Sequence, residues 1–129
     1  MPALVVLENE YLRAELLEER RVLILRRLPT PGPAAEVIGA YTAALADGRH
    51  FQGYSIVLDL REGPSRNDPE FEGSLGEMRR QLDRFFRRTV MLVGTAAGAL
   101  QVRRLAREQG RDVLVANDEA EALRLCDEA

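Results

Sequence analysis

At 129 residues, 46% of them hydrophobic and 30% charged, the chain has the size and composition of one globular domain. This composition excludes a disordered protein, and no apolar run approaches the ~20 residues that a membrane-spanning helix needs. The single cysteine, Cys126, excludes an internal disulfide and a zinc site of paired cysteines. The N-terminus lacks the charged segment of a secretory signal, so we expect one domain over residues 1–129 in a reducing, cytoplasmic setting.

The first quarter of the chain predicts three short strands that form an antiparallel meander. Apolar-rich stretches at Leu4–Leu7, Tyr11–Leu17 and Val22–Leu28 are separated by short polar segments, as in strands joined by tight turns. Prolines at 29, 31 and 33 then end the third strand, and proline is well suited to the first turn of a helix. A helix is therefore expected from about Pro33 to Asp47.

The rest of the chain alternates between strands and helices. Tyr54–Leu60 is a nearly continuous aliphatic run, typical of a strand that is covered on both faces. The later predicted elements are a helix opened by Pro69, a strand at Val90–Val93, a helix at Ala96–Gln109, a strand at Val113–Val115 and a helix at Asp118–Cys126. We expect Asn117 to cap the last helix and Thr95 to cap the one before it. The order βββαβαβαβα predicts an α/β domain with a mixed sheet, in which the later strands are parallel.

Three segments carry a resemblance to a known family: Ile56–Arg61, Arg88–Gly94 and Asp112–Leu123. With the element order, they resemble the STAS-like fold of anti-sigma-factor antagonists, especially the small bacterial family called sporulation-antagonist-like or STAS/CRAL-TRIO-like. The resemblance covers nearly the whole chain and departs at Arg124-Leu125, where the family tends to carry tryptophan and leucine. It implies a non-catalytic regulatory module that docks a protein partner through the helix after the central strand and the loop before it. The CRAL-TRIO comparison implies an alternative, which is a domain that binds a lipid or another small apolar anion.

The loop before that helix departs from the phosphorylation-switched members of the family. Those members carry a serine or threonine at the helix N-terminus, where free amides and the helix dipole favour a phosphate. This chain has Asn67-Asp68-Pro69 there, and the nearest hydroxyl, Ser65, lies outside such a motif. We predict that Asp68 caps the helix and that Ser65 is not a required switch. The alternative interpretation is that Asp68 permanently supplies the negative charge that phosphorylation would supply transiently.

No residue pattern predicts an enzyme, a metal site or a cofactor. His50, the only histidine, follows a helix-ending turn and is expected in a surface loop, and Cys126 is expected to be a partly buried packing residue. Asp59 ends the central strand, as a phosphoaccepting receiver aspartate would, but the chain has no lysine for that chemistry. We expect Asp59 to accept backbone hydrogen bonds at an edge of the sheet where ligands bind in such folds.

Charge is segregated along the chain. The stretch Arg79–Arg111 holds nine arginines and two acidic residues, a net charge of +7, whereas the remainder carries −10. We expect Arg84, Arg87 and Arg88 in the last turns of one helix and Arg103, Arg104 and Arg107 in another. This block is either a solvated face whose cations complement helix C-termini or a docking surface for an acidic protein or anionic lipid. A pI near 5.3 argues against nucleic acid as the partner. The sequence leaves the oligomeric state open, with a homodimer among the possibilities. The candidate partner-binding residues are Asp59, Arg61, Ser65, Asp68, Arg79, Arg80, Arg84 and Arg87.

Overall fold

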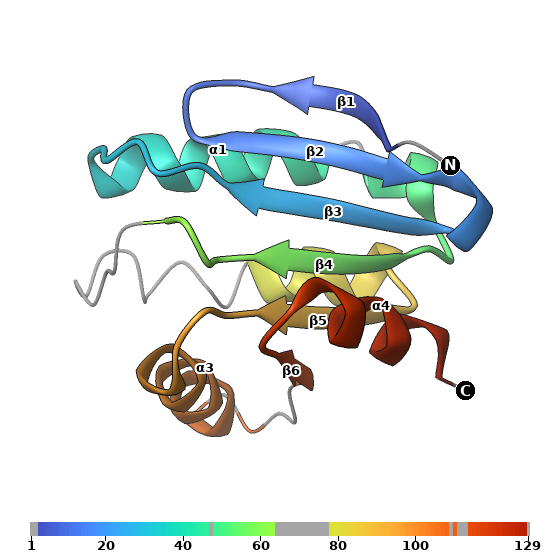
Figure 1. The fold of residues 1–129 in the computed structure, drawn as a ribbon. Coiled ribbons are helices and arrows are strands. Elements are labelled where there is room, and N and C mark those ends of the chain that lie inside the picture. The colour runs from blue at the N-terminus through green and yellow to red at the C-terminus, as the bar shows by residue number, and fades with distance from the viewer. Residues whose placement is uncertain (1–2, 47, 64–77, 109, 111–113, 129) are drawn as a thin grey trace.

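A single mixed β-sheet forms the centre of the domain in the computed structural model, which describes residues 3–46, 48–63, 78–108, 110 and 114–128. Within these residues the sheet has six strands in the order β1-β2-β3-β4-β5-β6 (Figure 1). The first three strands are antiparallel to one another, and β3 to β6 run parallel. The strands are β1 (Leu4–Glu8), β2 (Leu12–Leu17), β3 (Val22–Arg27), β4 (Ser55–Asp59), β5 (Arg88–Leu92) and β6 (Leu114–Ala116).

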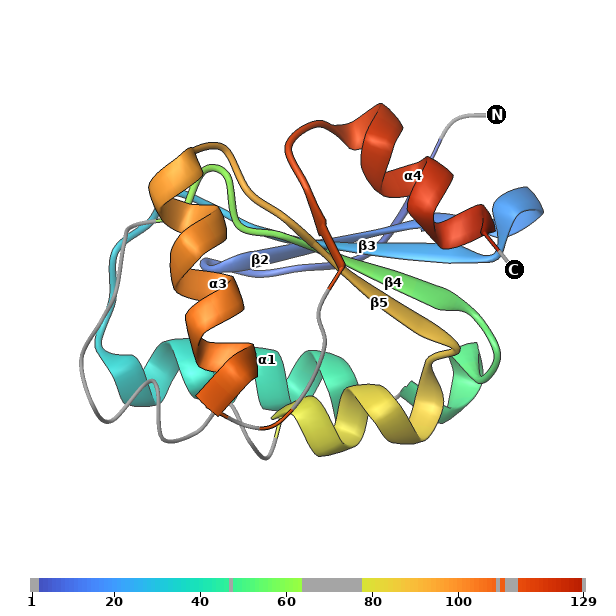
Figure 2. The same cartoon turned by 90° about the horizontal axis from the view of Figure 1, so that it is seen from below.

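Helices cover both faces of this sheet. The helices are α1 (Ala34–Ala46), a helical segment at 78–85, α3 (Ala96–Glu108) and α4 (Glu119–Asp127), with short 3-10 turns η1 (Glu18–Arg20) and η2 (Gly48–Phe51). Figure 2 shows α1 and the segment 78–85 on one face of the sheet and α4 on the opposite face. The observed order confirms the predicted α/β class, with an antiparallel meander followed by parallel strands. The predicted start of the second helix, at Pro69, lies outside the described residues.

The central strand β4 is buried along its whole length because it has a hydrophobic core on each side. Ile56 and Leu58 belong to the core under α1 and the segment 78–85, while Val57 belongs to the core under α4. Alternate residues of a strand point to opposite faces, so a continuous aliphatic run serves both cores. The core on the α1 side includes Leu12, Leu25, Val37, Tyr41, Met78 and Leu82, and the core on the α4 side includes Val22, Ile24, Val90, Ala122 and Cys126.

Two helix caps decide where the last helices begin. Thr95 caps α3 as predicted, since its Oγ1 accepts a hydrogen bond of 2.9 Å from the Gly98 amide. The prediction for α4 was wrong by one residue, because the cap is Asp118 and not Asn117. Asp118 Oδ1 accepts a 2.8 Å bond from the Glu121 amide, and Glu121 Oε1 accepts a 2.8 Å bond from the Asn117 amide. This reciprocal arrangement satisfies two amides and resembles a capping box, which Asn117 cannot set up from one position earlier.

The packing beside Gly48 gives a test of how tightly the α1-side core is filled. A Cβ at Gly48 would lie 2.7 Å from Phe85 Cδ2 and 3.1 Å from its Cγ. We therefore expect Gly48→Ala to lower the free energy of unfolding by about 1 kcal/mol, because overpacking forces neighbouring side chains to shift. Gly39→Ala in α1 is the matched control, since its Cβ would meet nothing within 4 Å, and it should stabilise the helix by roughly 0.5–1 kcal/mol. Urea unfolding measures both; equal stabilisation by the two changes would mean that the space beside Phe85 is open.

Candidate functional site

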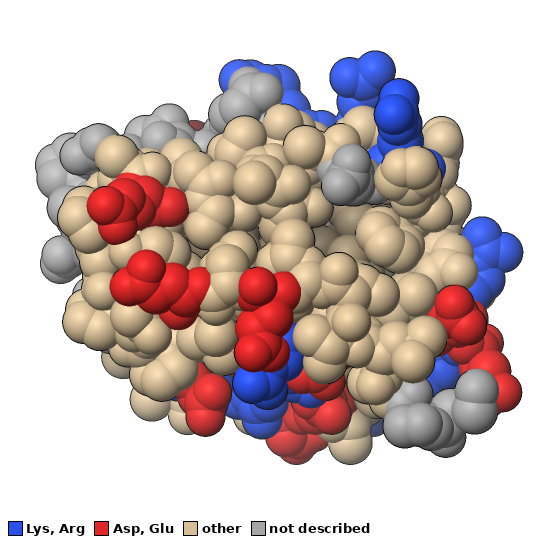
Figure 3. Space-filling model, turned by 90° about the horizontal axis from the view of Figure 1, so that it is seen from above, with Lys and Arg blue, Asp and Glu red and all other residues tan. Residues whose placement is uncertain are grey.

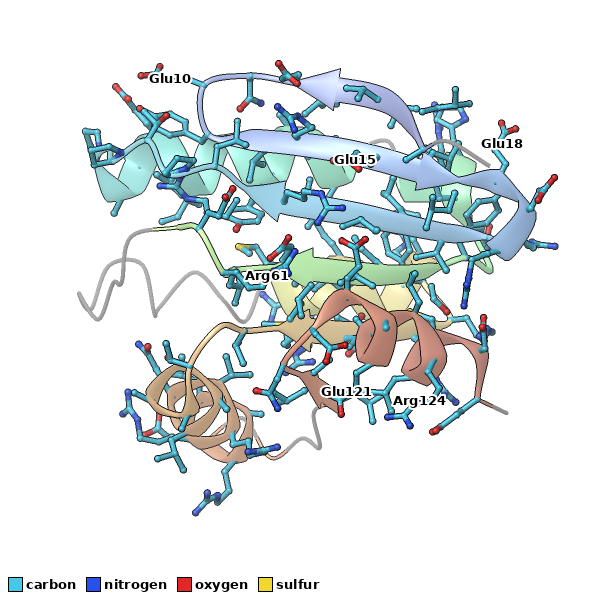
Figure 4. The ribbon with its side chains drawn as sticks, viewed as in Figure 1. Glu10, Glu15, Glu18, Arg61, Glu121 and Arg124 are labelled. Atoms are coloured by element: carbon cyan, nitrogen blue, oxygen red, sulfur yellow. The ribbon has the colours of Figure 1, made fainter. Side chains whose placement is uncertain are left out.

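Five charged side chains meet at the carboxyl end of the central strand β4; we call them the carboxylate–arginine cluster. They come from four places in the chain: Glu15 on β2, Arg26 on β3, Asp59 and Arg61 at the end of β4, and Glu119 at the start of α4. The parallel register of β3 and β4 sets Arg26 directly opposite Asp59. Figure 4 shows Glu15 on β2 and Arg61 at the end of β4. The cluster therefore depends on strand pairing between residues far apart in sequence.

Asp59 is the centre of this cluster. Arg26 Nη1 donates to Asp59 Oδ2 at 2.7 Å, and Arg61 donates from Nε and Nη2 to the two carboxylate oxygens, each at 3.0 Å. The Arg61 amide also donates to Oδ1 at 3.1 Å. Burial raises the pKa of Asp59, but the hydrogen bonds from Arg61 and Arg26 outweigh it and hold the pKa below its ordinary value. The predicted backbone bond is present, but the main partners of Asp59 are two guanidinium groups.

Arg26 links three carboxylates at once. Its Nε lies 2.7 Å from Glu15 Oε2, and its Nη2 lies 2.7 Å from Glu119 Oε1. Burial lowers the pKa of Arg26, but the hydrogen bonds to Glu15, Glu119 and Asp59 raise it by more, so the guanidinium stays charged. Because Arg61 Nη2 also lies 3.7 Å from Glu119, both arginines tie the first residue of α4 to the sheet. A carboxylate at that position is further favoured by the helix dipole.

The helical segment 78–85 is rich in arginine, and two of its arginines are exposed to solvent. In the helical segment 78–85, Met78 and Leu82 are buried whereas Arg80 and Arg84 are exposed. Residues two positions apart point to opposite sides of a helix, and residues four apart share a side, so the apolar side faces the core. Arg79 is half-buried between these two sides. The Arg84 guanidinium also lies over the Phe85 ring, 5.3 Å from its centroid.

Arg87 and Arg88 do not share that helix, contrary to the prediction that they lie in its last turns. The helix ends at residue 85, and Arg88 is the first residue of β5. Arg87 Nη2 donates to the Cys126 carbonyl and, at 3.2 Å, to Ser55 Oγ, while Arg88 Nη1 donates to the Leu125 carbonyl at 2.9 Å. We call these two side chains the α4 clamp, because they bind the last carbonyls of α4. Cations at that end also complement the helix dipole.

The remaining sequence candidates are not brought to the cluster. His50 is exposed in η2, as a surface residue was expected to be. Cys126 is only 1% exposed, more deeply buried than expected, and burial raises the pKa of its thiol. Ser65 and Asp68 lie outside the described residues, so the cap and the switch remain predictions.

The part of the chain that the structure describes holds no group of three or more His, Cys, Asp or Glu side chains that could bind a metal ion. Likewise, no helix among the described residues is long and apolar enough to cross a membrane. Comparison with known proteins found no matching family model, no matching curated protein and no matching solved structure. The STAS-like resemblance therefore remains an expectation from the sequence.

Proposed function

We propose that this domain is a non-catalytic docking module that binds an acidic protein partner through the arginines of the helical segment 78–85. The observation that carries the proposal is the exposure of Arg80 and Arg84, which lie one turn apart on the outer side of the segment. Met78 and Leu82 of the same segment are buried, so packing against the core holds the backbone that carries the two arginines. A planar guanidinium can bind a carboxylate through two parallel hydrogen bonds, which suits an acidic surface.

The distribution of charge supports the same proposal. Arg79–Arg111 carries a net charge of +7 in a chain whose total is −3. Such a positive region attracts an acidic partner and orients it during the encounter, whereas the acidic remainder of the molecule repels it. Exposed Arg103 and Arg107 on α3 extend the positive potential beyond the segment. The proposal therefore predicts binding that weakens as salt rises, since exposed charges are screened over ~8 Å at physiological ionic strength.

The carboxylate–arginine cluster supports a binding role over a catalytic one. Both oxygens of Asp59 accept hydrogen bonds from arginines, and its pKa is lowered, so it is a poor general base and has no open lone pair aimed at a substrate. The alternative of a lipid or small apolar anion needs a concave apolar site. The sequence favours the region of Tyr54, Phe71 and Phe85 for such a site. Phe71 lies outside the described residues, whereas the Tyr54 ring contacts the Phe51 ring and the Phe85 ring lies against Gly48.

The proposal is tested with an acidic peptide as probe, a fluorescent glutamate- and aspartate-rich dodecamer, whose binding is followed by anisotropy at low salt. The variant Arg80→Glu/Arg84→Glu should weaken binding by at least about tenfold, because attraction becomes repulsion at the contact. The matched control is Arg49→Glu/Arg124→Glu, which makes the same change in net charge at exposed positions outside the block. It should change the affinity by no more than about twofold if position rather than total charge matters.

Equal loss of binding in the two variants would contradict a docking site on the segment, because net charge alone would explain it. Unchanged binding in both would reduce the segment to a solvated face. Vesicles of phosphatidylglycerol and phosphatidylcholine form the second arm of the experiment. Tight vesicle binding without peptide binding would favour the lipid alternative over the acidic protein partner. Circular dichroism of each variant checks that the fold is intact.

A further inference from the structure

Helix α4 covers one face of the sheet with small side chains. Its two buried residues are Ala122 and Cys126, whereas its larger apolar residues, Leu123 and Leu125, are only partly buried. Helix α1 on the opposite face buries larger side chains: Val37, Tyr41 and Leu45. The hydrophobic contribution to stability grows with the apolar area that is removed from water, so α4 gains less from packing than α1 does.

Arginines hold both ends of α4. At its start, Glu119 lies 2.7 Å from Arg26 Nη2; at its end, the α4 clamp binds two carbonyls and Arg20 Nη2 lies 2.5 Å from Asp127 Oδ2. Several of these partners are open to water, since the side chains of Glu119, Arg20 and Asp127 are 42%, 43% and 54% exposed. Figure 3 shows acidic and basic side chains adjoining one another along its lower border, the side of the sheet that carries α4. Attraction between such exposed charges weakens as salt rises.

Two exposed residues, Asn117 and Asp118, join α4 to the last strand. That strand, β6, keeps its own pairing with β5 from Leu114 to Ala116. A change of backbone angles at the two joining residues is therefore enough to move α4 away from the sheet without breaking a strand pair. Such a movement uncovers the core on that face of the sheet: Val22, Ile24, Val57, Val90 and Leu92.

We propose that α4 is a latch, a helix that detaches from the sheet while the six strands stay paired, and that ionic strength sets how often it opens. Local opening is expected where a segment buries little apolar area and its polar contacts lie near water, and α4 meets both conditions. Salt then acts on the two faces of the sheet in opposite ways, because it weakens the attraction of an acidic partner to the segment 78–85 but favours exposure of the apolar face under α4. The latch does not depend on the proposed docking function.

The thiol of Cys126 reports the opening, because it is 1% exposed on the sheet side of α4 and is the only cysteine of the chain. Labelling of the full chain by methyl methanethiosulfonate, a small neutral reagent, is followed by mass spectrometry at reagent concentrations to which the rate is proportional. The rate relative to that of the urea-unfolded chain gives the equilibrium constant for opening. This constant should exceed the global unfolding constant from urea titration at least about 100-fold and depend little on urea. Equal constants would overturn the proposal.

Salt and one pair of variants test whether charge holds the latch closed. Raising sodium chloride from about 0.1 to about 1 M shortens the screening length from roughly 10 to roughly 3 Å and should speed labelling of the unmodified chain at least about threefold. Arg88→Met removes a bond of the α4 clamp and should speed labelling at least about fivefold. Arg124→Met is the matched control, because Arg124 pairs within α4, 3.6 Å from Glu121, and it should change the rate less than about twofold.

A variant in the opposite core separates local opening from global unfolding. Val37 is fully buried under α1, so Val37→Ala should raise the global unfolding constant at least about tenfold. It destabilises the closed chain and the chain with α4 open alike, so labelling of Cys126 should stay within about twofold. Labelling that rises in step with global unfolding would overturn the latch. Labelling of the unmodified chain that does not respond to salt would overturn its control by charge, whether or not the variants fold.

Discussion

Replacing Asp59 by asparagine is expected to lower the free energy of unfolding by about 3 kcal/mol, because it breaks a buried group of ion pairs. Asp59 is 4% exposed and accepts hydrogen bonds from both Arg26 and Arg61. An asparagine side chain has the same shape but no charge, and its amide group would face one of the guanidinium groups. Arg26, whose side chain is 18% exposed, would then lose its most buried counter-ion. Urea unfolding at neutral pH measures the loss.

The matched control is Glu8→Gln, which removes the charge of an exposed pair. Glu8 and Arg13 lie 2.8 Å apart, but their side chains are 53% and 40% exposed. Exposed pairs contribute less than about 1 kcal/mol, since water and salt screen them. A loss in Asp59→Asn that is no larger than the loss in Glu8→Gln would show that the carboxylate–arginine cluster does not hold the sheet edge together.

The same cluster sets the direction of a pH dependence. The folded state holds the pKa of Asp59 below the value of an unfolded aspartate, so the folded state favours the ionised carboxylate. Its stabilising contribution is complete above the unfolded pKa and is lost as the pH falls through the lower folded pKa. The stability difference between the unmodified chain and Asp59→Asn should therefore be constant near neutral pH and shrink below about pH 4. A difference that grows on acidification would contradict this assignment.

The fold could be predicted from the sequence because its signals are local. The aliphatic run of β4 and the alternation of strands and helices after it depend on neighbouring residues, and both were found in the structure. The start of β5 was missed because Arg88 and Thr89 are polar, and they join the strand through pairing with Ser55 and Ile56. The pattern of neighbouring residues does not show which distant strand a segment will pair with. Strand ends were therefore less predictable than strand existence.

Only part of the carboxylate–arginine cluster could be predicted from the sequence, because the rest depends on strand pairing. Asp59 and Arg61 are two positions apart in the sequence, and both were selected as candidates. Arg26 and Glu15 were missed because their contact with Asp59 requires the registers of β2, β3 and β4 to be known. One signal was present: Arg26 ends the apolar run of β3, and the same end of β4 carries Asp59. An alignment of parallel strands by their carboxyl ends would have suggested the pair.

Replacing Arg87 by methionine tests whether this arginine stabilises the fold or belongs to the proposed docking surface. The sequence placed Arg87 with Arg84 on one charged face, but its guanidinium binds the Cys126 carbonyl and Ser55 Oγ. Methionine keeps the apolar stem and removes these hydrogen bonds, so the free energy of unfolding should fall by about 1.5 kcal/mol. Arg84→Met, at an exposed position over Phe85, should cost less than about 0.5 kcal/mol.

Binding of the acidic peptide should show the reverse order in these two variants. Arg84→Met removes a charge from the proposed docking side and should weaken binding, whereas Arg87→Met should leave the affinity within about twofold, because its charge is engaged with the end of α4. Urea unfolding and anisotropy on the same samples give both quantities. If Arg87→Met kept full stability and weakened binding as much as Arg84→Met, Arg87 would belong to the docking side, and the α4 clamp would rest on Arg88 and its bond to the Leu125 carbonyl.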